Sequence, residues 1–232
     1  GEILFATEDG VARYDPSNGS WLSTWTPGNG LDSSLNDEVY ELWTDGTDLW
    51  VGTASRQGWQ VNPDIGVLDS SGNWTVHSNS ATVPSGYPMS IVECGGYIHI
   101  AMYNNWNGGV ARWDPATSSW ASSFTQGGNS GLDDDTPSAL TCDSSDVLYV
   151  GYYIADQPVS RFNYATGHWI ADLDDSSNGI STDAVWYDSL AWGGNQLMIG
   201  HGVSTGNGGG GGGSGGYSTL YASGTIAGQA SI

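Results

Sequence analysis

The sequence predicts an all-β protein built from one repeating unit, and three observations support this prediction. A four-residue apolar segment recurs at nearly constant spacing, starting at residues 3, 49, 98, 148 and 197. A tight turn and a tryptophan follow four of these segments at a similar distance, at Trp21, Trp74, Trp120 and Trp169. No segment has the length and spacing of an amphipathic helix. Repeats of about 40 to 50 residues made of short strands are typical of propeller blades. We therefore expect a β-propeller of four-stranded antiparallel blades, with five as the preferred count.

The second repeat shows the two inner strands of a blade. We expect an innermost strand over Val39–Thr44 and a second strand over Leu49–Thr53, joined by a polar turn at residues 45–48. Short apolar segments bounded by turn residues are typical of strands. The same pair of segments recurs in the later repeats, so each blade is expected to begin in this way.

The first repeat shows the two outer strands. We expect a third strand over Val11–Tyr14 and an outer strand over Ser20–Thr26, with a turn at Asp15–Gly19 between them. In this turn proline fixes φ, aspartate bonds back to the backbone and glycine takes the left-handed conformation. A linker at Gly28–Ser33, repeated near residues 128–133 and 178–181, then returns the chain to the centre of the next blade.

The two ends of the chain raise the question of ring closure. Residue 1 leads directly into a second strand, so the first blade is expected to lack its innermost strand. The last segment, Gly224–Ile232, is either the outer strand of the fifth blade or a strand that pairs into the first blade. We interpret residues 1–232 as a single propeller domain that closes into a five-bladed ring. The alternative is a fragment of a larger propeller, whose exposed strand edges would need a partner.

The repeated segments resemble a known type of propeller repeat. Leu-Trp-Val-Gly-Thr at residues 49–53, Gly-Val-Ala-Arg-Trp-Asp at residues 109–114 and the tryptophan at 120 are similar to the two-component-regulator repeat of the YVTN/WD-like propellers. The resemblance covers nearly the whole chain, with four clear copies and one degenerate copy. It implies the propeller fold, and it implies a sensor domain or an extracellular ligand-binding domain.

The charge of the chain restricts its partners. Four arginines and no lysine stand against 25 acidic residues, which gives a net charge of −21. Nucleic acid and anionic membranes are therefore excluded as partners, because both require a cationic surface. No apolar run approaches the roughly 18 residues that span a bilayer. We expect a secreted or cell-surface protein without a cofactor. Its acidity would reflect solubility, a high-salt habitat or, as a third alternative, bound Ca²⁺.

Two further residue types have candidate structural roles. Cys94 and Cys142 occupy equivalent places in successive repeats, and we interpret them as buried free thiols, with a disulfide as the alternative. Three arginines fall at one repeat position, where Leu68 replaces them in the second repeat; they are Arg13, Arg112 and Arg161. We expect these arginines to pair with nearby aspartates or stack on the repeat tryptophans. The repeat tryptophans are expected to pack between blades.

The loops between second and third strands and the linkers are expected to share one face, and there the repeats differ most. Aromatic side chains beside amides and carboxylates are the mixture that binds sugars. The linkers add Tyr87 and the aspartates at 133–135 to this face. The candidate ligand-binding residues are Trp59, Tyr103, Asn105, Trp106, Tyr152, Tyr153 and His201. The alternative is that these are variable loops without a ligand.

Three functions remain open from the sequence. The first is a binding or scaffold module for a glycan, a small polar ligand or another surface protein. The second is a polysaccharide-cleaving enzyme, which would need a carboxylate pair; the candidates are Asp9, Asp37, Asp135 and Asp183. The third is a purely structural repeat segment. We also consider a metal site formed by His99 and His201 near the ring axis, although their spacing matches no metal motif.

Overall fold

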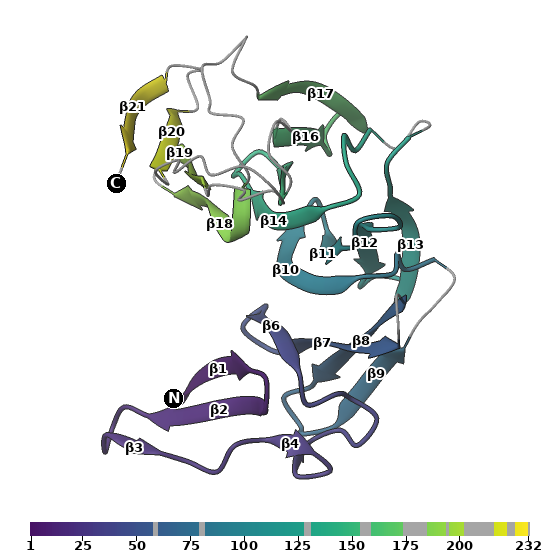
Figure 1. Cartoon of the computed structure of the whole chain (residues 1–232), viewed down its shortest axis with the longest axis vertical. Helices are drawn as coiled ribbons and strands as arrows, with labels where there is room; N and C mark the ends of the chain where they lie inside the picture. Colours follow the sequence, from purple (N-terminus) through teal and green to yellow (C-terminus); the bar gives the residue numbers. More distant parts are fainter. Residues whose placement is uncertain are drawn as a thin grey trace, which may run out of the picture.

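A computed structural model shows an all-β architecture of five antiparallel sheets arranged in order around an arc (Figure 1). All elements in the described part of the chain are strands. The described residues are 1–57, 60–78, 82–127, 131–153, 159–173, 185–193, 195–201, 216–221 and 226–231. The predicted fold class, a propeller of four-stranded blades, is confirmed.

The first two sheets lie at the beginning of the arc. The first sheet has the order β1 (Ile3–Thr7), β2 (Gly10–Asp15) and β3 (Ser20–Trp21). The linker contains a short parallel pair, β4 (Thr26–Pro27) and β5 (Gly30–Leu31). The second sheet has the order β6 (Val39–Thr44), β7 (Leu49–Gln57), β8 (Gln60–Leu68) and β9 (Trp74–Ser78).

The remaining three sheets repeat the four-stranded pattern. The third contains β10 (Tyr87–Cys94), β11 (Tyr97–Tyr103), β12 (Gly109–Asp114) and β13 (Ser119–Phe124). The fourth contains β14 (Pro137–Cys142), β15 (Val147–Tyr152), β16 (Val159–Asn163) and β17 (His168–Leu173). The fifth contains β18 (Val185–Gly193), β19 (Gln196–His201), β20 (Gly216–Tyr221) and β21 (Ile226–Ser231).

The innermost strands β6, β10, β14 and β18 contact one another in sequence order and form the inner side of the arc. Strand β1 occupies the second-strand position, since Ile3 pairs with Tyr14 as Ile98 pairs with Trp113 in the third sheet. The first sheet therefore lacks an innermost strand, as the sequence predicts. The first and fifth sheets form the two ends of the arc (Figure 1), and closure into a five-bladed ring stays a prediction.

Each sheet packs one face against the sheet before it. Ile98, Ile100 and Trp120 of the third sheet pack with Trp50 of the second. Trp169 of the fourth sheet packs against Phe124 of the third, with ring centroids 5.0 Å apart. In the second sheet, the Trp74 indole N–H donates to the Gly30 carbonyl at 3.1 Å. These contacts confirm the predicted packing role for three of the four repeat tryptophans.

The first sheet shows what this face looks like without a preceding sheet. Phe5 is 43% exposed, whereas its counterparts in the second strands of the other four sheets are all 0% exposed; these are Val51, Ile100, Val150 and Ile199. Trp21 is 64% exposed and rests on the rings of Phe5 and Tyr14. The packing role predicted for Trp21 is therefore wrong within this chain, because no sheet covers its face.

The two cysteines form a disulfide, so their interpretation as free thiols is wrong. Cys94 at the end of β10 and Cys142 at the end of β14 are bonded, with Cα atoms 5.6 Å apart. The innermost strands of neighbouring sheets lie against each other, and equivalent positions on them therefore come within disulfide range. The bond joins the third and fourth sheets at their inner edge.

The strand register also corrects the arginine position. Arg112 pairs with His99 and Arg161 pairs with Tyr149, while the residue opposite Trp50 in the second sheet is Val67. Val67, and not Leu68, therefore replaces the arginine. Counting back two residues from the aspartate that begins the turn, which is Asp69 in this repeat, gives the same assignment.

The three arginines stack or form hydrogen bonds, but with partners other than the predicted aspartates and repeat tryptophans. The Arg112 guanidinium lies 4.5 Å from the ring centroids of both Tyr97 and Phe124 and 5.7 Å from that of Tyr164. Arg13 pairs with Glu2 at 2.8 Å and covers the Trp25 ring. Arg161 donates from Nε to the Ala171 carbonyl at 2.7 Å. The guanidinium groups of these three arginines therefore lie against neighbouring strands and loops.

His99 lies in the same interface beneath Arg112 and is fully buried. Its Nε2 is 2.5 Å from the Tyr164 hydroxyl. Burial, together with the charge of Arg112, lowers the pKa of His99 to about 3. The imidazole is therefore neutral in the folded protein over the physiological range, and it serves as a packing residue between the third and fourth sheets.

Removing the disulfide is expected to destabilise the fold. The Cys94→Ala/Cys142→Ala double variant should lose roughly 2 to 4 kcal/mol of unfolding free energy, because the bond closes a loop between residues 48 positions apart in the unfolded chain. Urea denaturation of the variant and of the oxidised parent measures this difference. Equal unfolding midpoints would show that the inner strands hold together without the bond.

The pKa of His99 predicts a pH dependence of stability. Because the folded-state pKa of about 3 lies below the ordinary value of 6.5, the unfolded chain binds the proton more readily between these values. The free energy of unfolding should therefore fall as the pH falls from 6.5, by up to about 1.4 kcal/mol per pH unit from this residue. His99→Gln should remove that part of the slope, whereas His168→Gln, at an exposed position, should not. Parallel pH curves for the parent and His99→Gln would contradict the assignment.

Candidate functional site

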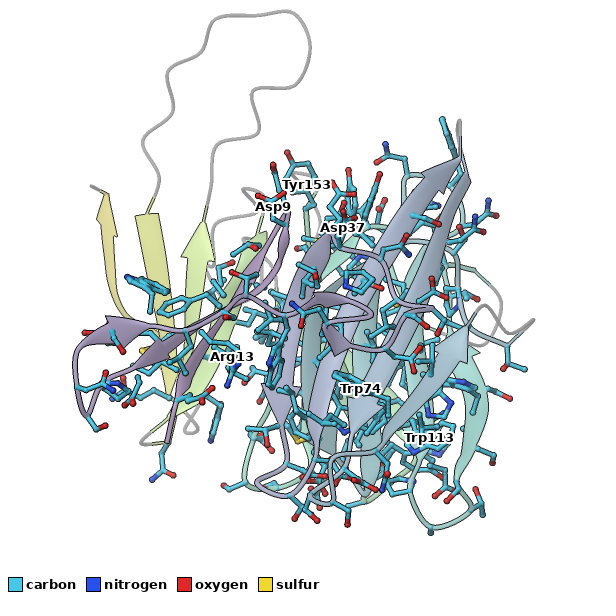
Figure 2. The ribbon with its side chains drawn as sticks, turned by 90° about the horizontal axis from the view of Figure 1, so that it is seen from below. Asp9, Arg13, Asp37, Trp74, Trp113 and Tyr153 are labelled. Carbon is cyan, nitrogen blue, oxygen red and sulfur yellow. A yellow bond between two sulfur atoms is a disulfide. The ribbon has the colours of Figure 1, made fainter. Side chains whose placement is uncertain are left out.

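The loops between second and third strands and the blade-to-blade linkers lie at one end of the sheets, which we call the loop face. Figure 2 places Asp9, Asp37 and Tyr153 together at this end, with Trp113 at the opposite end. The predicted gathering of the loops on one face is therefore present. Asp9 and Asp37 are both exposed there.

A row of four tyrosines crosses the loop face and joins three sheets. Tyr40 and Tyr87 stand near the starts of the innermost strands β6 and β10, with ring centroids 4.9 Å apart. Tyr87 lies 6.4 Å from Tyr103, and Tyr103 lies 5.3 Å from Tyr153. The structure thus brings together Tyr103 and Tyr153, which the sequence singles out. It adds Tyr40, which the sequence reasoning missed, and gives Tyr87 a place in the row.

Two tyrosines of this row, Tyr40 and Tyr103, have a raised pKa. Burial raises the pKa of Tyr40 far above its usual range, and a hydrogen bond with Glu38 adds to this effect. Burial also raises the pKa of Tyr103, with smaller contributions from Tyr153 and Tyr87. The Tyr103 hydroxyl donates to Asn105 Oδ1 at 3.1 Å. The row therefore combines flat apolar rings with hydroxyl and amide groups.

Trp106 borders a hollow of about 350 Å³ on the third sheet. Its ring is 64% exposed, and its backbone N–H donates to Asn104 Oδ1 at 3.2 Å, which fixes the turn that carries the ring. The other side chains that line the hollow include Pro84, Asn107, Gln126 and Asp135. Burial raises the pKa of Asp135. An exposed indole beside amide and carboxyl groups is a suitable surface for a polyhydroxylated ligand.

Gly108 sets the shape of this hollow. A Cβ atom at this position would lie 1.8 Å from the carbonyl oxygen of Asp135. The loop that carries Trp106 and the linker that carries Asp135 therefore approach each other at backbone level. Only glycine permits this approach without a shift of one segment.

The other predicted site residues have different positions. Tyr152 is 1% exposed, and its hydroxyl bonds to Ser160 Oγ at 2.8 Å and accepts from the Asp133 N–H at 3.1 Å. It belongs to the core of the fourth sheet, and its predicted place on the ligand surface is wrong. Trp59, Asp183 and the side chain of His201 lie outside the described residues.

Among the described residues, one group of three potential metal-ligating side chains lies close together. The group of three metal-type side chains found there is Cys94, Cys142 and Asp146, and both sulfur atoms are bonded to each other. His99 is buried at the seam of the third and fourth sheets, where its Nε2 is hydrogen-bonded to the Tyr164 hydroxyl. The described loop face offers aromatic rings, hydroxyls, amides and exposed carboxylates, among them Asp9 and Asp37.

Comparison with known proteins supports the fold. No protein-family model and no curated protein sequence matches the chain. A crystal structure of a protein of unknown function from Bacteroides caccae matches with a TM-score of 0.64 and 13% identity, over 100% of this chain and 78% of that one. The Dos1 propeller matches with a TM-score of 0.56 and 12% identity, over 100% and 56%.

A third structure, the extracellular domain of a protein named as a one-component system from B. thetaiotaomicron, matches with a TM-score of 0.51 and 16% identity, over 100% of this chain and 35% of that one. At these identities the likeness shows the fold alone. The chain is a β-propeller protein that spans between 35% and 78% of the length of these structures. No helix within the described residues is long and apolar enough to cross a membrane.

Gly108→Ala is expected to displace the Trp106 loop, because its Cβ would overlap the Asp135 carbonyl. We expect a changed indole N–H resonance for Trp106 in a two-dimensional NMR spectrum, with a loss of about 1 to 3 kcal/mol of stability. Gly193→Ala is the control, since nothing lies within 4 Å of a Cβ at that position. An unchanged Trp106 resonance would show that the loop and the linker adjust independently.

Proposed function

We propose that this chain is an extracellular β-propeller module that binds a neutral glycan on its loop face. The observation that carries the proposal is the row of tyrosines Tyr40, Tyr87, Tyr103 and Tyr153, with the exposed Trp106 on the neighbouring loop. Aromatic rings cover the apolar faces of pyranose units, and nearby amides and carboxylates bind their hydroxyls.

The charge of the protein supports a neutral ligand. The net charge is −21, and Arg13, Arg112 and Arg161 occupy positions on the third strands with partners of their own. None of these three arginines lines the Trp106 hollow. An anionic polysaccharide would meet the carboxylate of Asp135 at this hollow, and none of the described lining residues is cationic, so a neutral glycan or a similar polyhydroxylated molecule fits best.

Two observations support a place outside the cytosol. The Cys94–Cys142 disulfide is typical of proteins that fold in an oxidising compartment. One of the matching structures is the extracellular domain of a bacterial one-component system. The resemblance of the repeats to two-component-regulator propellers agrees with a role in sensing or capturing a ligand at the cell surface.

A panel of neutral oligosaccharides tests the proposal. The chain should bind selected members, and Trp106→Ala should weaken that binding about tenfold, which corresponds to the loss of one stacking contact of about 1.4 kcal/mol. Trp21→Ala is a matched control, because Trp21 is also 64% exposed but lies on the first sheet, away from the loop face. Tyr103→Ala should weaken binding in the same direction as Trp106→Ala.

The same experiment separates the alternatives. Release of shortened oligosaccharides would assign the loop face to a polysaccharide-cleaving enzyme. An absence of binding by the folded chain, or an equal loss with Trp21→Ala and Trp106→Ala, would overturn the proposal and favour a structural role for the repeats.

A further inference from the structure

A second hollow lies between the second and third sheets, at the end of the molecule opposite the loop face. Its volume is about 560 Å³, and Trp113, which lines it, is at the lower end of the sheets in Figure 2. Its walls are aromatic and its rim is acidic. The side chains that matter here are Trp50, His77 and Trp113 in the walls, Val67 on the second sheet, and Asp45, Asp48 and Glu93 as acidic groups.

Val67 stands where the first, third and fourth sheets place an arginine. It pairs with Trp50 across β7 and β8, as Arg112 pairs with His99 across β11 and β12. At the next seam, between the third and fourth sheets, the Arg112 guanidinium lies among the rings of Tyr97, Phe124 and Tyr164. The hollow is thus the counterpart of a seam that is filled by a cation elsewhere in the same protein.

The aromatic surroundings are retained at the empty seam. His77 pairs with Ile65 as Phe124 pairs with Val110, so His77 takes the place of one ring that holds Arg112. The rings of His77 and Trp113 are 4.3 Å apart, and Trp50 lies 6.4 Å from Trp113. Aromatic side chains therefore surround this hollow, although the second sheet has no arginine for them to contact.

Carboxylates replace uncharged groups around the hollow. Asp48 directly precedes β7 as Tyr97 begins β11, so a carboxylate stands where an aromatic ring touches Arg112. Glu93 pairs with Ile98 as Cys142 pairs with Leu148, so it corresponds to one end of the disulfide.

Asp45 corresponds to the other end. It follows Thr44, which pairs with Leu49 at the inner edge of the second sheet, and the matching residue of the third sheet is Cys94. Where the third and fourth sheets are joined covalently, the second and third therefore present two carboxylates to one cavity. Asp45 Oδ1 accepts from the N–H groups of Thr47 and Asp48, which fixes its side chain at the rim.

No positive side chain that the structure describes lines the hollow. Burial lowers the pKa of His77, so its imidazole contributes a neutral ring at neutral pH. A ring wall with three carboxylates and no cation attracts a positively charged group strongly, since the ring faces and the carboxylates act in the same direction.

We propose that this hollow binds an organic cation, a guanidinium or ammonium group on an alkyl stem, in the place that Arg112 fills at the next seam. The charged group lies against Trp50, His77 and Trp113 within reach of the carboxylates, and the alkyl stem packs on Val67. The volume is in the range of small-molecule sites. This site is separate from the loop face and does not depend on the proposed glycan binding.

The test uses n-butylguanidinium and its neutral isostere n-butylurea with the intact chain, followed by NMR titration. We expect one saturable site for the guanidinium, with shifts at the indole resonances of Trp50 and Trp113, and at least tenfold weaker binding of the urea. Equal binding of both compounds would overturn the proposal, because only the guanidinium carries the charge. Displacement of the guanidinium by millimolar Ca²⁺ would also overturn it and assign the carboxylates to a metal.

Two variants locate the site. Val67→Arg should place an arginine side chain in the hollow. The variant should therefore no longer bind n-butylguanidinium, and its melting temperature should rise. Asp48→Asn should weaken binding at least threefold, whereas Asp37→Asn, which removes the same charge from the opposite end, should not. Unchanged binding by a folded Val67→Arg variant would contradict the proposal. If that variant does not fold, equal affinities of Asp48→Asn and Asp37→Asn would contradict it instead.

Discussion

Every sheet of this protein is apolar on both faces, and burying both faces against neighbouring sheets is the constraint on which the rest of the structure depends. The second strands show it most clearly. On the face toward the preceding sheet Val51, Ile100, Val150 and Ile199 are completely buried, and on the other face Trp50 and Tyr149 are also buried. Four-residue apolar segments are therefore retained while the loops and turns vary. The two hollows lie at opposite ends of the sheets, one beside the Trp106 loop and one beside Trp113.

The seams share one geometry but differ in what fills them. The seam between the third and fourth sheets is closed by Arg112, neutral His99 and a disulfide. The seam between the second and third sheets has Val67 and acidic side chains at the corresponding positions. Residue differences at a few equivalent positions thus decide whether a seam is filled by stabilising contacts or contains a cavity lined by aromatic and acidic side chains. Function in repeat folds of this kind is best sought where equivalent positions disagree.

The repeat spacing predicts the strands well because each apolar segment must be buried in every blade. The expected strand Val39–Thr44 is β6 as observed, whereas the expected outer strand Ser20–Thr26 is continuous only at Ser20–Trp21 and is paired again with β2 at Trp25. Distances between blades are not readable from one repeat, so the disulfide was mispredicted. Tyr152 and Tyr153 are adjacent, and the sequence does not show that only Tyr152 is buried. Tyr40 was missed because only the meeting of neighbouring inner strands reveals the row.

The exposed sheet faces at the two ends of the arc differ from each other, and this difference restricts the symmetry of a contact between two copies of the chain. The first sheet presents Phe5 and Trp21, on the face that other sheets turn toward the preceding one. The fifth sheet exposes its opposite face, the one that other sheets turn toward the following sheet. Met198 lies on this face, is 46% exposed, and occupies the position of Trp50 in the second sheet. The two surfaces resemble the two sides of one seam and are not copies of each other. A contact that pairs them between two molecules is therefore heterologous and directional, and it has no two-fold axis.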